Sequence, residues 1–151
     1  MIYLALLLSI ALIGGLSAVG LKVAQTVQLR NAEADLLGIG VEFRNALQSY
    51  AEVTPNGLPP TPDSLNELLR DPRFPGMRRH LRRIYHDPLT GKAEWGIIRG
   101  PDRRIVGIHS LSSGACFKLE NFPAGLESLS GTTRHSDWVF SLASIPVPVA
   151  R

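Results

Sequence analysis

The sequence predicts an α+β fold in which a long N-terminal helix packs against a small antiparallel β-sheet. Three observations lead to this prediction. Residues 2–21 form an uncharged apolar run, residues 22–53 continue it with helical periodicity, and alternating stretches separated by turn signals follow Asp87. We therefore expect an apolar half of the helix (1–21), an amphipathic half (22–53) and one head domain (54–151).

The apolar run from Ile2 to Leu21 matches the thickness of a lipid bilayer. About 20 residues at about 1.5 Å each give roughly 30 Å, and Lys22 ends the run. A cleavable signal peptide is disfavoured, because no charged side chain precedes the run and residues 16–18 make a poor cleavage site. The run is interpreted as a retained transmembrane anchor. Taken literally, the basic residues after it would place the head in the cytoplasm.

The amphipathic half carries an apolar stripe at steps of three, four and seven residues. No proline occurs before Pro55, so a nearly continuous helix is predicted from about Ile2 to Val53. Gly38 and Gly40 each weaken a helix by about 1 kcal/mol relative to alanine, and some bending is expected there. The stripe consists of Val23, Val27, Leu29, Leu36, Leu37, Val41, Phe43, Leu47 and Tyr50.

Loops and short helices are predicted for the segment after the long helix. Proline and glycine break the helix in residues 54–62. Thr61 is then predicted to cap a short helix that ends near Arg70. A further short helix is predicted over Met77–Tyr85, with its arginines facing outward.

Three short strands are predicted in the rest of the head. Residues 93–99 and 105–112 form a hairpin, and residues 137–144 supply the third strand. Asp87–Lys92 is predicted to form a turn before the hairpin, because Asp87 can accept from its own downstream backbone and Gly91 can adopt positive φ. A loop or a short helix is expected around Phe117–Leu129. The proline-containing tail 145–149 can at best line a sheet edge.

Clustered polar side chains give no recognisable catalytic or metal-binding spacing. The histidines are interpreted as solvated or capping residues, and Cys116 as a small buried side chain. Few carboxylates follow Asp102, which disfavours calcium. No catalytic residue, metal or cofactor is therefore predicted. The groups considered were His80, His86, His109 and His135 with Asp87, Glu94 and Asp137.

A basic cluster supplies much of the net charge of +3, which results from 16 basic and 13 acidic residues. Nucleic acid or lipid phosphate is a possible partner of such a cluster. A subunit-contact patch that pairs with Asp71, Asp87, Glu94 or a neighbour's acids is favoured, and no nucleic acid is expected. The cluster consists of Arg78, Arg79, Arg82 and Arg83.

The whole pattern resembles the type IV pilin and type II secretion pseudopilin family. The leading helix is similar to the family's half-anchor, half-spine helix, and residues 87–113 resemble its Asp-Pro turn followed by a hairpin. The segment 136–140, SDWVF, resembles a closing strand of the same group. The resemblance implies a pilin-like fold. Two features depart from the family: Ala5 stands where it has a glutamate, and no basic leader precedes Met1, so either the start lies further upstream or the chain is not processed.

The resemblance implies a structural subunit, not an enzyme, that assembles into a filament through its N-terminal helix. It also implies a single-pass protein of the bacterial inner membrane, with its head in the periplasm. Other pseudopilin subunits, an inner-membrane secretion platform, its ATPase-driven machine and membrane lipid would be the partners. The residues predicted for anchoring and helix–helix assembly are Leu4, Leu6, Leu7, Ile10, Ile13, Gly14 and Leu16. The alternative is a single-span membrane protein whose periplasmic head binds a ligand or partner without forming a filament.

Overall fold

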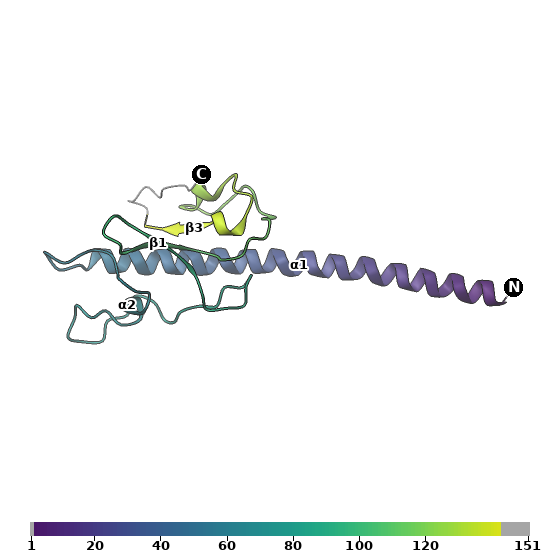
Figure 1. Cartoon of the computed structure of the whole chain (residues 1–151), viewed down its shortest axis with the longest axis horizontal. Coiled ribbons are helices and arrows are strands. Elements are labelled where there is room, and N and C mark those ends of the chain that lie inside the picture. The colour runs from purple at the N-terminus through teal and green to yellow at the C-terminus, as the bar shows by residue number, and fades with distance from the viewer. Residues whose placement is uncertain (1, 143–151) are drawn as a thin grey trace.

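A single helix, α1 (Ile2–Glu52), runs through the whole length of the molecule (Figure 1). The computed structural model describes residues 2–142, and for residue 9 and residues 12–21 it describes the backbone alone. The head lies along the C-terminal part of α1, and the N-terminal part projects from it (Figure 1). The predicted continuous helix is therefore confirmed within one residue of its expected end.

The head covers only the later part of the predicted apolar stripe. Val23, Val27 and Leu29 are exposed, and burial begins at Glu33. From there the buried side chains recur at helical spacing, so one face of α1 forms the floor of the core. These buried apolar residues of α1 are Leu36, Leu37, Phe43, Ala46, Leu47 and Tyr50.

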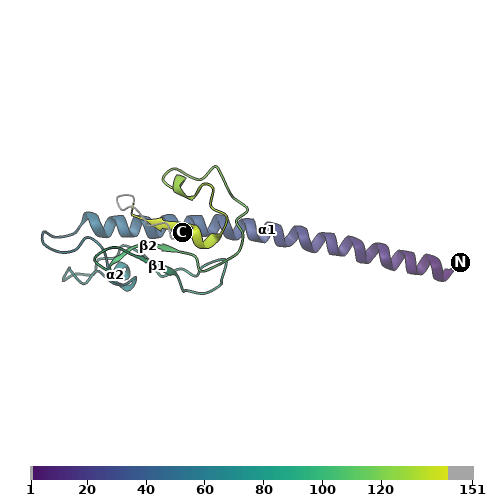
Figure 2. The ribbon, with the colours of Figure 1, turned by 45° about the horizontal axis from the view of Figure 1, so that its top comes forward.

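Within residues 2–142 the sheet has three antiparallel strands, as predicted, and their order is β1-β2-β3. Each strand is shorter than expected. The strands are β1 (Gly96–Arg99), β2 (Ile105–His109) and β3 (Val139–Ser141). β2 lies between the other two (Figure 2), and Ile108 of β2 is paired with Phe140 of β3. The α+β arrangement of one long helix on a small antiparallel sheet is therefore confirmed.

The sheet packs directly on the helix at Gly40. A Cβ atom placed on Gly40 would lie 2.2 Å from ring atoms of Phe140, so any side chain there would collide with β3. Gly38, one half-turn away, has open space around it. The two glycines that predicted bending therefore have different surroundings, and Gly40 allows β3 to approach α1.

The turn before the hairpin forms as predicted. The backbone N–H of Asp87 donates to the carbonyl of Lys92, Gly91 donates back to Asp87 and has φ +72°, and the Leu89 N–H donates to Oδ1 of Asp87. Oδ2 of Asp87 accepts a 2.7 Å hydrogen bond from the Ser110 hydroxyl at the end of β2. Both side chains are buried, so this bond joins the turn to the sheet inside the head.

Two predicted short helices differ from the structure. α2 (Asn66–Leu69) is a single turn that starts later than expected, and the Thr61 hydroxyl donates to Asp102 instead of capping it. Residues 77–85 form no helix. The N–H groups of His80 and Leu81 donate to the carbonyl of Leu68, so their backbone bonds go to α2 and not to their own segment.

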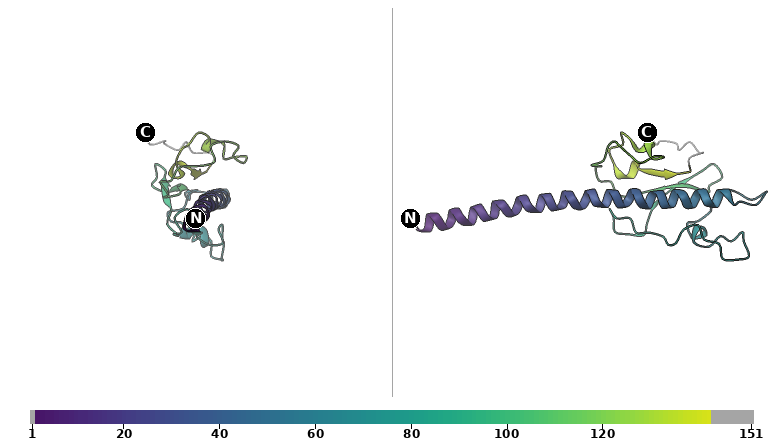
Figure 3. Two further views of the ribbon diagram at one scale, coloured as in Figure 1. Left: turned by 90° about the vertical axis from the view of Figure 1, so that its right-hand side faces the viewer. Right: turned by 180° about the vertical axis from the view of Figure 1, so that it is seen from behind.

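The segment after β2 returns to α1 through irregular structure. It contains two short 3-10 turns, η1 (Glu127–Leu129) and η2 (His135–Asp137), and one isolated bridge between Ala115 and Arg134. The expected short helix is thus the single turn η1. Figure 3 shows this segment and β3 on one side of α1 and the region of α2 on another. The predicted edge position of the tail 145–149 lies outside the described residues.

Candidate functional site

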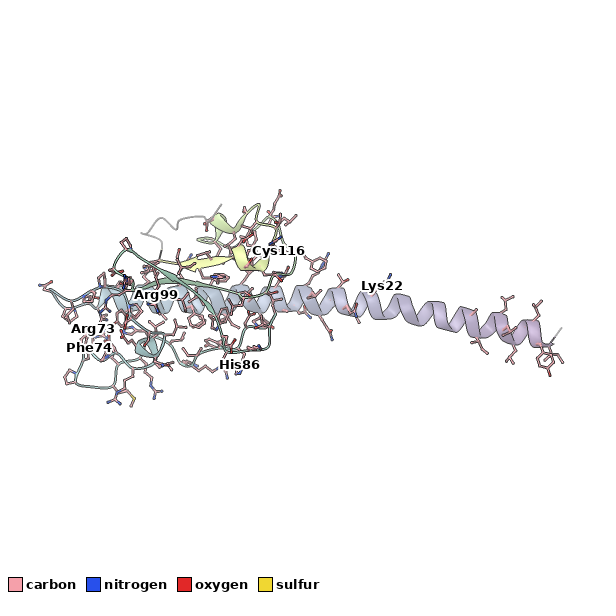
Figure 4. The ribbon with its side chains drawn as sticks, viewed as in Figure 1. Lys22, Arg73, Phe74, His86, Arg99 and Cys116 are labelled. Atoms are coloured by element: carbon pink, nitrogen blue, oxygen red, sulfur yellow. The ribbon has the colours of Figure 1, made fainter. Side chains whose placement is uncertain are left out.

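The projecting half of α1 presents an apolar surface that the head does not cover. Leu4, Leu7 and Ile10 are 60–65% exposed, and Leu6 is also exposed. Lys22 lies on this bare part of the rod (Figure 4). Because large apolar side chains are stabilised by removal from water, this surface favours association with another apolar surface. The side chains of the other predicted assembly residues, Ile13, Gly14 and Leu16, lie outside those that the structure describes.

The predicted localisation is not upheld. Within the described residues, no helix combines the length and the apolar character needed to cross a membrane. A span requires about 20 consecutive apolar residues. The prediction of a single-pass protein of the bacterial inner membrane with a periplasmic head is therefore corrected.

The four arginines of the predicted basic patch all lie on the surface of one loop. Arg78 stacks over the ring of Phe74 at 4.7 Å, and Arg83 over the ring of Tyr85 at 5.1 Å. Arg79 and Arg82 are exposed as well. None of these four takes part in an ion pair of the described chain, so their charges face outward.

Asp71, which was a predicted partner of that patch, is instead part of a buried network. Its carboxylate accepts from the Arg73 guanidinium at 2.7 Å and from Nε2 of His80 at 3.2 Å. The hydrogen bonds from Arg73 outweigh the effect of burial and lower the pKa of Asp71 to about 2. The guanidinium also lies 3.5 Å from the centre of the Tyr50 ring and donates to the Tyr50 carbonyl. This network fastens the loop to the C-terminal end of α1 (Figure 4).

A second buried carboxylate lies at the other end of the head, where α1 enters it. Glu33 is 3% exposed and accepts hydrogen bonds from the N–H groups of Phe117 and Lys118 at 2.7 and 3.1 Å. It also lies 2.7 Å from Nε2 of His135 in η2. These contacts connect α1 to residues more than 80 positions later in the chain.

Cys116 completes a group of potential ligands beside this carboxylate. One ligand atom from each of Glu33, Cys116 and His135 lies within 4.8 Å of the other two. Cys116 is half-buried, and burial raises the pKa of its thiol to about 12, with smaller effects from the carboxylates of Glu33 and Asp137. Carboxylate, thiol and imidazole are together a donor set for a transition metal.

The interpretation of the histidines from the sequence is wrong for two of the four. His80 and His135 are enclosed and paired with carboxylates. His86 is exposed, and Nδ1 of His109 donates to the carbonyl of Ser110. Glu33 is buried as well, although it carries a charge. Its position three and four residues before Leu36 and Leu37, on the same face, is the signal that indicates its burial.

Comparisons with protein-family models, with curated proteins and with solved structures give no significant match to this chain.

Proposed function

We propose that the protein is a structural subunit of a filament, with a pilin-like fold similar to that of type II secretion pseudopilins. The observation that supports this most is the division of α1. One part carries the head on a continuous apolar face, and the other projects with large apolar side chains in solvent. A second copy of the same helix is the occupant we propose for the projecting part.

The energetic basis is the burial of apolar surface between copies. Removing a leucine or isoleucine side chain from water contributes about 1.5–3 kcal/mol. Several side chains of this size are exposed in the first 10 residues of α1, so their joint burial contributes on the order of 10 kcal/mol before the cost of association. They are Ile2, Leu4, Leu6, Leu7, Leu8 and Ile10.

The shape of the subunit favours a filament over a closed dimer. The apolar surface lies at one end of a rod and the folded head at the other, so copies staggered along a common axis bury helix against helix while the heads remain outside. Such contacts are heterologous, and repeated heterologous contacts that do not close generate an open helical assembly. In this arrangement the partners are other subunits of the same kind and the secretion platform that adds them.

The head contributes contacts between neighbours and is assigned no catalytic role. The outward-facing arginines Arg78, Arg79, Arg82 and Arg83 form a positively charged surface on one loop. In a filament they would meet acidic side chains of the adjacent head, such as the exposed Glu94 or Glu120. Surface pairs of this kind set register between subunits more than they set affinity.

The test compares assembly of the full-length chain with that of charged variants. The protein is purified in detergent, the detergent is diluted, and assembly is followed by sedimentation and electron microscopy. Leu7→Lys and Ile10→Lys are expected to abolish fibres, because each places a charge in the apolar helix contact. Leu58→Lys is the matched control, since Leu58 is an exposed leucine of the head, and it is expected to assemble normally. Fibres formed equally well by the Leu7→Lys chain would contradict the proposal.

A further inference from the structure

We propose that Glu33, Cys116 and His135 bind one Zn²⁺ ion at the point where α1 enters the head. The three residues come from three separate parts of the chain, namely α1, the bridged segment after β2 and η2. Their ligand atoms nevertheless lie within 4.8 Å of one another. Side chains on three separate elements that converge to this degree need only small shifts to surround a single ion.

The carboxylate is held in position by the backbone. The N–H groups of Phe117 and Lys118 donate to Oε1 and Oε2 of Glu33, respectively. Each carboxylate oxygen offers two lone pairs, so these bonds leave acceptor capacity for a metal. Hydrogen bonds of this type around a ligand fix its orientation and increase metal affinity.

The imidazole has binding capacity that the protein does not use. His135 is 2% exposed, Nε2 contacts Glu33, and Nδ1 is buried without a hydrogen-bond partner among the described residues. Buried polar atoms are normally satisfied by protein, water or an ion. The ring is therefore not saturated by its surroundings, and one of its nitrogens is the second ligand.

The Cys116 thiol is the third ligand. A carboxylate oxygen of Glu33 lies within 4.8 Å of its sulfur, and Lys118, the cation nearest to Cys116 in the sequence, lies over the ring of Phe122. Binding exchanges the S–H bond of Cys116 for an S–Zn bond and releases the proton to solvent. Because Cys116 is only half-buried, the ion can be reached from solvent, and water takes the fourth position.

The donor set selects zinc among the common metals. A thiolate, an imidazole and a carboxylate form a mixed sulfur, nitrogen and oxygen set that suits tetrahedral Zn²⁺, whereas Ca²⁺ and Mg²⁺ take oxygen ligands. The ion would hold the segment around Cys116 and η2 against α1 beside the projecting half of the helix (Figure 4). Its role is structural, and it stabilises the end of the head from which the assembly helix emerges.

The test uses the full-length chain in detergent, without a histidine tag and stripped of metal by a chelator. Zn²⁺ is titrated in competition with a chromophoric chelator, and Co²⁺ is used as a spectroscopic substitute. We expect one Zn²⁺ per chain, a rise in melting temperature with Zn²⁺, and a near-ultraviolet thiolate-to-cobalt absorption band. The sequence contains one cysteine, so this band can only come from Cys116.

Two variants separate this site from other binding. Cys116→Ala is expected to lose the cobalt band and at least about tenfold in zinc affinity, while its circular dichroism in chelator is unchanged. His86→Ala removes an exposed histidine and is expected to bind as the unmodified chain does. Unchanged zinc affinity in Cys116→Ala, loss of binding in His86→Ala, or no cobalt–thiolate band would each overturn the proposal. If Cys116→Ala does not fold, the cobalt spectrum of the unmodified chain decides alone.

Discussion

Glu33 and His135 lie 102 positions apart in the chain, yet Nε2 of His135 is 2.7 Å from a carboxylate oxygen of Glu33. The same carboxylate accepts from two backbone N–H groups, so removing it leaves several buried donors without a partner. We predict that Glu33→Ala lowers the free energy of unfolding by about 2–4 kcal/mol. Denaturant unfolding in chelator measures this effect without a metal contribution. Asp35→Ala, two residues away and exposed, is the control and should change stability by less than about 0.5 kcal/mol.

Gly40 and Gly38 provide a matched pair in the same helix. Gly40→Ala is predicted to destabilise the head by about 2 kcal/mol or more, because the new methyl group would meet the Phe140 ring at 2.2 Å in a packed core. Gly38→Ala meets nothing within 4 Å and should stabilise the protein by up to about 1 kcal/mol through helix propensity. Thermal melts of both variants test the pair. Equal effects of the two substitutions would show that β3 does not approach α1 at Gly40.

The lowered pKa of Asp71 leads to a prediction for how stability changes at acid pH. Its pKa is lowered from 3.8 to about 2 in the folded protein, so the folded state binds its proton less readily than the unfolded state. The resulting stabilisation, about 2 kcal/mol, is complete above about pH 4 and is lost as the pH falls towards 2. Asp71→Asn should therefore be less stable at pH 7, and the difference from the unmodified chain should narrow between pH 4 and 2. A difference that stays constant over this range, measured by denaturant unfolding, would argue against the ion pair.

Loss of the hydrogen bond between Ser110 and Asp87 is predicted to have a smaller effect on stability. Ser110→Ala removes the 2.7 Å hydrogen bond to a fully buried carboxylate, and we expect a loss of about 1–3 kcal/mol. Ser113→Ala, three residues later on the surface, should change stability by less than about 0.5 kcal/mol. Denaturant midpoints of the two variants decide whether the Asp87 turn is joined to β2 by this bond.

The features that could be predicted from the sequence are those with local signals. The absence of proline before Pro55 and the apolar stripe indicated α1, and Asp87 to Gly91 indicated the turn before the hairpin. The misplaced features depend on partners distant in the chain. Residues 77–85 have helical spacing, but backbone hydrogen bonds from His80 and Leu81 to the carbonyl of Leu68 take the place of a helix. The side chain of His80 is paired with the carboxylate of Asp71. No local pattern specifies such partners.

The two candidate sites also differ in whether a local sequence signal predicts them. The apolar surface of the projecting helix could be predicted from the sequence, because a long uncharged run can be recognised without knowing the fold. The group around Glu33 could not, because its members are separated by 83 and 19 positions in the sequence, and no known ligand spacing connects them. Its recognition required the fold that brings η2 onto α1.

The contact between Gly40 and Phe140 also affects how the chain is made. The inner face of α1 leaves the ribosome early, while the strand that covers it, β3, is synthesised only about 100 residues later. During that interval the growing polypeptide exposes apolar side chains on both the projecting part of α1 and the part that the head later covers. Because transiently exposed apolar surface promotes aggregation, association with other chains competes with folding during this interval.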